Sequence, residues 1–219
     1  MGGRFSRPSS TSRAFNLPRV TTANLDFYSS GNAAYLEHLT IGADVLTLQE
    51  VKDIDVAALM PAGWGVCQDT SSDARAGSAV AYRVEAVALQ DWWLVKGCDA
   101  PAGGGMLPRW ICCADLIHDG GPLFAVSAHA PPPRYAELQP GYAAEVAAVV
   151  EDYPDAIVGA DANQDIDQWA RALGPGMVAY GKQSGICLVT RRPVSDVTLD
   201  GWGEAHNMTD HPAVAADLP

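Results

Sequence analysis

The chain has 219 residues, 48% of them apolar, and a formal net charge of −12 at pH 7. This length and apolar fraction are sufficient for one domain with a full hydrophobic core. The negative charge argues against tight, metal-free, non-specific DNA binding, because proteins that bind in that way present a basic surface to the phosphates. A phosphodiester substrate stays possible, since a bound divalent cation supplies positive charge locally.

Residues 1–18 differ in composition from the rest of the chain. They hold three arginines among serine, glycine and proline and no acidic residue, which predicts a flexible basic tail before a single domain over 19–219. With no apolar leader and no run of roughly 18 apolar residues, we expect a soluble, cytoplasmic protein without a membrane partner. Five cysteines without Cys-x-x-Cys spacing indicate neither a disulfide framework nor a zinc site.

The first part of the domain reads as short strands and helices in alternation. Residues 19–25 and 43–50 are apolar and rich in β-branched residues, which predicts two strands. Between them, the apolar spacing over 32–40 predicts a short helix. Asp53 is the expected N-cap of another short helix that runs to Met60, where Pro61 stops it.

The middle of the chain is expected to be mostly β. Residues 77–82 and 86–94 read as paired strands, and the Gly- and Pro-rich stretch 97–108 reads as a loop. Strands over 109–117 and 123–129 then form a hairpin, because the Asp-Gly-Gly between them supplies the positive φ of a tight turn.

The last third contains two further helices and several short strands. An amphipathic helix is expected over 135–151 after three consecutive prolines, and a second helix over 168–173. The apolar run 156–160 predicts a buried strand. Further strands are expected over 184–190, 194–199 and 213–216.

Polar residues of one kind recur where these strands meet loops. A single Asp-x-Asn after a strand is typical of a turn, so the repetition is what indicates a site. Because strand ends in antiparallel sheets can face the same edge, one opening could contain all of these side chains. They are, at strand exits, Asn24, Glu50, His129, Asp161 and Asn163, and, just before the last strand, Asp210 and His211.

This set is rich in hard oxygen donors, which suits Mg²⁺ or Mn²⁺ better than zinc. Glu50 is the best candidate metal ligand. The two histidines can transfer protons near neutral pH, as hydrolysis of a phosphate ester requires. Asn24 and Asn163 can donate hydrogen bonds to the non-bridging oxygens, where charge must be stabilised.

The same residues lie in five short motifs, and with them the chain resembles the endonuclease/exonuclease/phosphatase superfamily, which has the DNase I-like fold. The motifs occur in the family order between residues 20 and 217. They are Thr22-Ala23-Asn24, Leu48-Gln49-Glu50, Ser127-Ala128-His129-Ala130-Pro131, Gly159-Ala160-Asp161-Ala162-Asn163 and Thr209-Asp210-His211-Pro212-Ala213-Val214.

The resemblance implies an α/β (α+β) fold, namely a four-layered α/β/β/α sandwich of two mostly antiparallel sheets flanked by helices. It also implies a divalent-metal-dependent hydrolase of phosphate esters. In that scheme Glu50 binds the metal with help from Asn24 and Asp210, and His211 acts as the base. Asp161 and Asn163 orient water and phosphate.

Two more residues take their expected roles from the resemblance. His129 protonates the leaving group or binds the phosphate. Arg109 resembles an arginine that contacts the phosphate in some members, and its guanidinium can grip a phosphate through two hydrogen bonds. An ordinary surface arginine is the alternative interpretation of Arg109.

One position departs from the family pattern. The family carries a strand aspartate that orients the catalytic histidine, and the natural alignment puts Cys187 there. Loss of such a carboxylate costs about 10⁴ in rate in serine-protease triads. The replacement is consistent with a slow enzyme, with a lost activity, or with a substitute carboxylate at Asp196, Asp200 or Glu204.

Three functions are therefore in competition. The leading interpretation is an endonuclease-like phosphodiesterase that acts on nucleic acid with Mg²⁺ or Mn²⁺. A small-molecule phosphatase fits the acidic chain as well. The third interpretation is a non-catalytic binding module on the same fold, which the replacement at Cys187 suggests.

Overall fold

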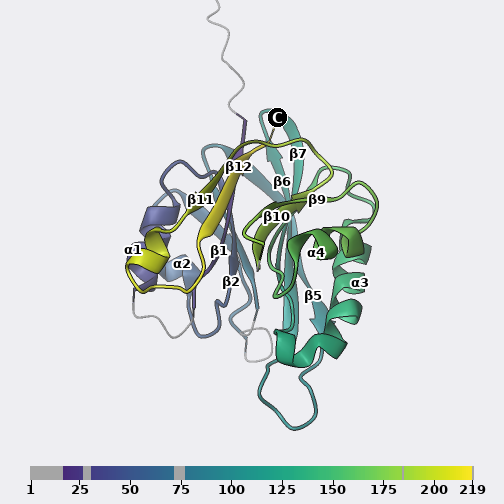
Figure 1. Cartoon of the computed structure of the whole chain (residues 1–219). Coiled ribbons are helices and arrows are strands. Elements are labelled where there is room, and N and C mark those ends of the chain that lie inside the picture. The colour runs from purple at the N-terminus through teal and green to yellow at the C-terminus, as the bar shows by residue number, and fades with distance from the viewer. Residues whose placement is uncertain (1–16, 27–30, 72–76, 184, 219) are drawn as a thin grey trace, which may run out of the picture.

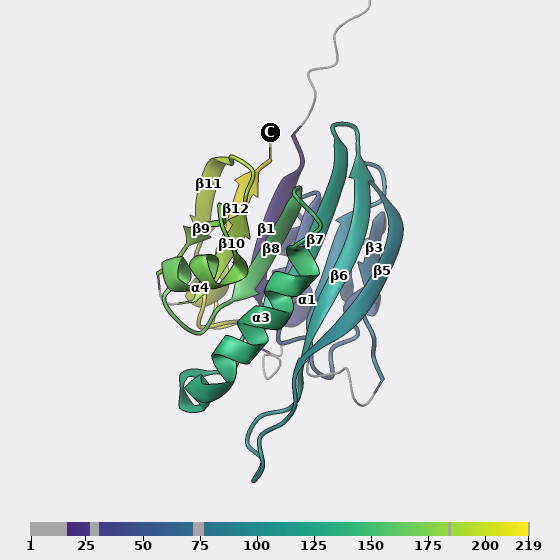
Figure 2. The same cartoon turned by 90° about the vertical axis from the view of Figure 1, so that its right-hand side faces the viewer.

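The computed structural model describes residues 17–26, 31–71, 77–183 and 185–218. Two six-stranded sheets lie face to face, and helices cover the outer face of each sheet (Figures 1 and 2). This arrangement confirms the four-layered α/β/β/α sandwich. Residues 1–16 of the expected basic tail lie outside the described residues, so the tail stays a prediction.

The first sheet contains one parallel pair, β1 with β2, and its other neighbouring strands are antiparallel. Its strands in spatial order are β11 (Ser195–Asp200), β12 (Ala213–Asp217), β1 (Arg19–Asn24), β2 (Val45–Gln49), β4 (Ala79–Arg83) and β3 (Trp64–Cys67).

The second sheet also contains one parallel pair, β7 with β8. Its strands in spatial order are β5 (Val87–Cys98), β6 (Arg109–His118), β7 (Gly121–His129), β8 (Ala156–Asp161), β10 (Ile186–Thr190) and β9 (Val178–Gly181). The expected β6–β7 hairpin is confirmed, with His118 paired to Gly121 across the turn.

The helices divide between the two outer faces. The first sheet carries α1 (Asn32–Leu39), α2 (Val56–Leu59) and α5 (Trp202–Ala205), and the second carries η1 (Pro133–Leu138), α3 (Gln139–Val150) and α4 (Ile166–Leu173). Among the described residues, no helix is both long enough and apolar enough to span a membrane. The cytoplasmic location stays a prediction.

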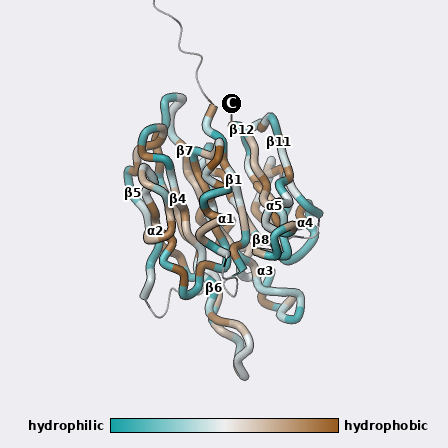
Figure 3. The backbone as a smooth tube through the Cα atoms, turned by 90° about the vertical axis from the view of Figure 1, so that its left-hand side faces the viewer, coloured by the Kyte–Doolittle hydropathy of each residue, from teal (hydrophilic) through white to brown (hydrophobic). Residues whose placement is uncertain are grey.

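Apolar side chains fill the three spaces between the layers. Hydrophobic residues run along the strands and hydrophilic residues gather in the connecting loops (Figure 3). Adjacent residues of β6 pack into different layers. Cys112 packs between the sheets, whereas Cys113 packs towards α3 and α4. All five cysteines are free, as their spacing predicted.

Some expected elements differ from the structure. The strands predicted over 77–82 and 86–94 do not pair, because β4 lies between β2 and β3 while β5 lies at the edge of the other sheet. The short link at 84–86 therefore crosses between the layers. The strands β3 and β9 and the helix α5 were not predicted, since each is only four residues long and shows no clear periodicity.

Two helix starts were also placed wrongly. Asp55, not Asp53, caps α2, where its carboxylate accepts a hydrogen bond from the Ala58 amide at 3.1 Å. The helix expected from residue 135 begins at Gln139 instead, because Tyr135 has the non-helical backbone angles φ −125° and ψ 41°. The Tyr135 hydroxyl is occupied elsewhere, since it donates to the Gly104 carbonyl at 3.0 Å.

Candidate active site

The polar residues at the strand ends converge because of the strand directions. In the parallel pair β1–β2, Asn24 lies opposite Gln49, and in the parallel pair β7–β8, His129 lies opposite Asp161. Strand β12 runs antiparallel to β1, so its start lies at the same edge. The two sheets together therefore bring all the predicted strand-end residues to one end of the sandwich.

Glu50, His129 and Asp161 form the centre of this end. One possible ligand atom from each lies within 4.8 Å of the other two. His129 Nε2 lies 3.6 Å from Asp161 Oδ2 and 3.8 Å from Glu50 Oε1. Burial, followed by the charge of Asp161, raises the pKa of Glu50 above its usual value. Two crowded carboxylates of this kind favour a bound cation.

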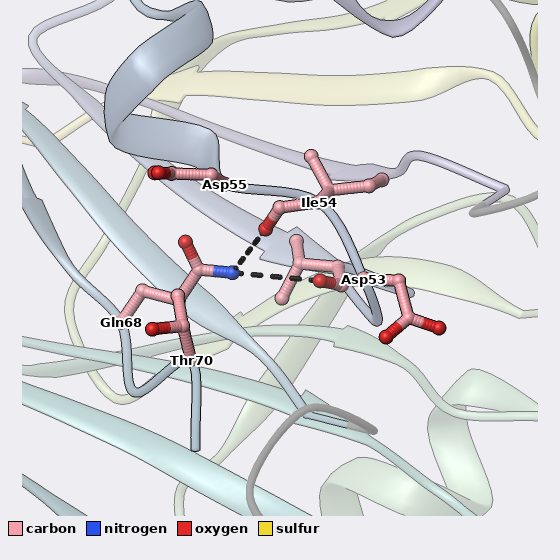
Figure 4. A pocket seen from close by; sticks show the side chains of 6 residues that line it. Asp53, Ile54, Asp55, Gln68 and Thr70 are labelled. Carbon is pink, nitrogen blue, oxygen red and sulfur yellow. Dashed lines mark hydrogen bonds between the residues drawn. The ribbon is translucent and has the colours of Figure 1, made fainter. Parts of the chain in front are cut away.

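The backbone holds Glu50 in an uncommon conformation. Its φ is +55°, in the left-handed region that residues other than glycine and asparagine rarely adopt. Gln68 fixes the turn that follows, because its amide donates to the carbonyls of Ile54 at 2.7 Å and Val51 at 3.4 Å (Figure 4). A residue with positive φ at a strand exit, followed by a turn that side-chain hydrogen bonds fix, is typical of a functional position.

The pocket in Figure 4 lies in the turn that follows Glu50, and its two carboxylates do not converge on one point. The carboxylates of Asp53 and Asp55 point away from one another in this view. Asp55 is occupied by the cap of α2, and Asp53 pairs with Lys52 at 3.3 Å.

Asn24 and Asn163 hold Asp161 from two sides. Asn24 Nδ2 donates to Asp161 Oδ2 at 3.0 Å, and its Oδ1 accepts from the Asp26 amide at 2.9 Å. The Asn163 amide N–H donates to Asp161 Oδ1 at 3.2 Å, while its side-chain nitrogen donates to the Ala130 carbonyl at 2.9 Å. The Asn24 side chain thus hydrogen-bonds both Asp161 and Glu50, and Asn163 lines the cavity, so their roles toward a metal and a phosphate stay predictions.

His129 is held neutral with its proton on a defined nitrogen. Burial, followed by the charges of Arg109 and His211, lowers the pKa of His129 well below its usual range. Arg109 Nη1 lies 3.0 Å from His129 Nδ1, and a guanidinium can only donate. The proton of the neutral ring therefore lies on Nε2, which faces Glu50 and Asp161. Arg109 also lines the cavity described below and contacts His129, which favours a role in the site over that of an ordinary surface arginine.

His211 lies at the rim with about a quarter of its side chain exposed, and its Nε2 is 3.6 Å from Asp161 Oδ2. The neighbouring Asp210 was predicted to help Glu50 bind the metal, but it lies outside the cluster of Glu50, His129 and Asp161. Its side chain is 83% exposed, and its Oδ1 lies 3.2 Å from His211 Nε2. Asp161 takes the place beside Glu50 that the sequence assigned to Asp210.

The structure corrects the alignment at Cys187. The Cys187 thiol is fully buried among the apolar side chains beneath α3 and α4. The position that faces the site is Gly185, where a Cβ atom would lie 3.2 Å from Asp161 Oδ1 and 3.9 Å from His211 Cε1. The orienting aspartate of the family pattern is therefore absent at residue 185.

The three substitute carboxylates are engaged away from His211. Asp196 pairs with Arg19 at 3.0 Å, and Glu204 pairs with Lys182 at 3.2 Å. Asp200 accepts from His38 Nε2 at 2.6 Å and belongs to the face covered by α1. Asp161 is thus the buried carboxylate next to His211 among the described residues.

A buried polar network behind the site locks the two sheets together. Gln49 Nε2 donates to Ser127 Oγ at 3.1 Å, and Ser127 Oγ donates to the Leu48 carbonyl at 2.8 Å. Gly159 makes this close approach possible, because a Cβ there would lie 1.7 Å from Thr47 Oγ1. The strands that carry Glu50, His129 and Asp161 therefore have a fixed relative position.

The site opens into a cavity of about 910 Å³. Several of its walls were not predicted as parts of the site, because they come from loops without a recognisable motif. Its charged and titratable lining comprises Asp26, Glu50, Lys52, Arg109, His129, Arg134, Asp161, Asp210 and His211, and the rest is Ala100, Gly104, Gly105, Met106, Leu107, Pro132 and Asn163.

No protein-family model and no curated protein sequence matches the chain. Solved structures do match. An endonuclease/exonuclease/phosphatase from Bacteroides vulgatus is 17% identical, with 92% of this chain and 98% of that chain covered and a TM-score of 0.74. D. rerio TDP2 complexed with single-strand DNA product is 14% identical, with 92% and 98% covered and a TM-score of 0.72. The chain has the endonuclease/exonuclease/phosphatase fold.

The same fold in other proteins carries different activities. A mannosyl-6-phosphatase from Bacteroides thetaiotaomicron is 15% identical to this chain, with 92% of this chain and 99% of that chain covered and a TM-score of 0.68. At such identities the endonuclease/exonuclease/phosphatase fold is what is shared, so the chemistry of this chain must be argued from its own site.

Proposed function

We propose that the protein is a divalent-metal-dependent phosphoesterase. The observation that carries this proposal is the group of Glu50, His129 and Asp161, whose possible ligand atoms lie within 4.8 Å of one another beside a cavity that also contains Arg109. Two carboxylates, a neutral histidine and a guanidinium at one point are suited to a phosphate together with a cation.

The residues present fit Mg²⁺ or Mn²⁺. Glu50 and Asp161 offer hard oxygen ligands, and burial, followed by the charge of Asp161, raises the pKa of Glu50. Glu50 and Asp161 would hold the ion. When bound, it would polarise a phosphoryl oxygen and offset its charge.

The surrounding side chains supply proton transfer and orientation. His211 faces the cavity and can accept a proton from the attacking water. His129 presents its Nε2–H to the cluster and can donate to a phosphoryl or leaving oxygen. Arg109, held against His129 Nδ1, places positive charge where a phosphate would lie. Asn24 and Asn163 keep Asp161 in position.

The first candidate substrate is a phosphodiester of nucleic acid, in line with the single-strand DNA product bound to the similar D. rerio TDP2. A small phosphate ester is the second candidate, because the cavity lining contains four carboxylates and only three Lys or Arg side chains. A long polyanion needs a row of cations along its path, whereas a compact ester does not.

The test is a panel of plasmid, single-stranded DNA, RNA and nitrophenyl phosphate esters with Mg²⁺ or Mn²⁺ and with a chelator. We expect hydrolysis that requires the metal and is lost in Glu50→Gln and His211→Ala. If the purified protein hydrolyses none of these esters with either ion, the proposal is wrong. A binding function that survives both substitutions would then identify a non-catalytic module.

A further inference from the structure

We infer that the β5–β6 loop and η1 form an apolar subsite, which receives an apolar or aromatic group attached to the phosphate of the substrate. This inference deepens the proposed function and rests on it. The loop projects from the end of the molecule opposite the C-terminus (Figures 1 and 2). Five of its residues, namely Ala100, Gly104, Gly105, Met106 and Leu107, line the cavity.

The size of the cavity supports a substrate larger than inorganic phosphate. A volume of about 910 Å³ lies in the range of pockets that enclose drug-sized ligands, and Glu50, His129 and Asp161 are only three of its sixteen lining residues. The remaining volume must accept the organic part of an ester.

The chemistry of the loop wall is apolar. Met106, Leu107 and Pro132 line it, and the cations Arg109 and Arg134 flank it, two residues after Leu107 and two residues after Pro132. Leu107 is 46% exposed although it is large and apolar, and it faces the cavity. Burying such a surface against a ligand is favourable, whereas a second phosphate would gain little from it.

The wall is also held in shape before a ligand arrives. Arg134 Nη2 donates to the Gly105 carbonyl at 2.7 Å, and the Tyr135 hydroxyl donates to the Gly104 carbonyl at 3.0 Å. The Arg134 guanidinium lies over the Tyr135 ring at 5.3 Å. Gly105 has φ +91°, and a Cβ there would lie 2.5 Å from the Tyr135 hydroxyl, so the close contact requires glycine. Because the wall is already ordered, less conformational entropy is lost when a ligand binds.

The shared chemistry of the expected substrates is a phosphate with an apolar or planar substituent. An aryl phosphate and the base-bearing end of a nucleotide both fit this description. Stable phosphonates test the subsite without turnover, because phenylphosphonate and methylphosphonate differ only in that substituent.

The experiment is a titration of the full-length protein with each phosphonate in the presence of Mn²⁺, by calorimetry. We expect the wild type to bind phenylphosphonate at least about tenfold more tightly than methylphosphonate, and Leu107→Ser to reduce that preference about fivefold. The matched control is Leu199→Ser, because Leu199 is exposed to a similar extent on β11 and does not line the cavity.

Equal affinity of the wild type for the two phosphonates, or an unchanged preference in Leu107→Ser, would overturn the subsite. This result is distinct from a failure of the proposed function. A protein that hydrolyses esters but does not discriminate between the phosphonates keeps the function and loses the subsite. A protein that prefers phenylphosphonate but hydrolyses no ester keeps the subsite and loses the function.

Discussion

The two sides of the cavity are built in different ways. On one side, Glu50 and Asp161 lie at the ends of central strands, and a buried network between the sheets fixes those strands. On the other side, residues 100–107 form a glycine-rich loop that two side chains of η1 hold by its carbonyls. The strand side can determine the chemistry, and the loop side can determine which ester enters.

This difference predicts two kinds of mutational effect. A substitution at the strand ends should reduce the hydrolysis of every ester by a similar factor, since it removes groups that act on the phosphate itself. A substitution in the loop wall should change the ratio between esters and leave the poorest substrate almost unaffected.

The largest effect is expected for Glu50→Gln. Loss of one of two carboxylate ligands removes transition-state stabilisation of several kcal/mol, so kcat/KM should fall about 10²- to 10³-fold for all esters. Stability should not decrease, because the neutral amide avoids the burial of a charge and, to a lesser extent, the repulsion from Asp161. Steady-state rates and thermal melts measure both quantities. Asp53→Asn is the control, and a comparable loss in that variant would contradict the assignment.

Gly159→Ala tests the close packing of the two sheets at Gly159. A Cβ would lie 1.7 Å from Thr47 Oγ1 and 2.7 Å from Thr22 Oγ1, so the sheets must move apart. We expect a loss of about 1–3 kcal/mol in the free energy of unfolding, measured with urea. Gly141→Ala in α3 is the matched control, since a Cβ there has no neighbour within 4 Å. An equal stability of the two variants would show that the close approach at Gly159 is unimportant.

Two substitutions test which of residues 185 and 187 faces the active site. Gly185→Ala presses on Asp161 Oδ1 at 3.2 Å and should lower kcat about tenfold with little change in stability. Cys187→Ala should cost about 1 kcal/mol of stability through a small core cavity and leave kcat close to that of the wild type. If instead Cys187→Ala lowers kcat and Gly185→Ala does not, then Cys187 and not Gly185 faces the site.

A further prediction concerns the pH dependence of stability. The pKa of His129 is lowered in the folded protein, so its contribution to stability is fully present above the unfolded pKa of about 6.5 and is lost as the pH falls. His129→Asn keeps an acceptor for Arg109 and cannot titrate. Between pH 7 and 5, the wild type should therefore lose stability relative to His129→Asn, by up to about 1.4 kcal/mol per pH unit. Parallel curves from urea unfolding would contradict a buried neutral His129.

The layers were expected from the resemblance carried by the five short motifs, whereas the polar strand ends were evident from local patterns. Apolar strands that end on Glu50, His129 and Asp161 carry their own signal, and parallel neighbours place those ends at one edge. The four-residue elements such as β3 and α5 lack enough residues to show a period, so they were missed.

The roles within the site depended on distances that no motif encodes. Asp210 and Asp161 are both acids next to a catalytic candidate, but only the buried Asp161 faces Glu50. The misplaced alignment at Cys187 has a similar cause, since Gly185 has no side chain to mark its position. The loop wall with Leu107 was expected only as a loop, because its function depends on carbonyls bound by Arg134 and Tyr135.

The most direct test of the account is a count of Mn²⁺ ions bound by the metal-free protein, read from the loss of the free-ion electron paramagnetic resonance signal. We predict one ion at the strand ends of the wild type, with affinity strongly reduced in Glu50→Gln and Asp161→Asn and retained in Asp210→Asn. Binding that is absent in the wild type, or is unchanged in Glu50→Gln and Asp161→Asn, would contradict the central claim.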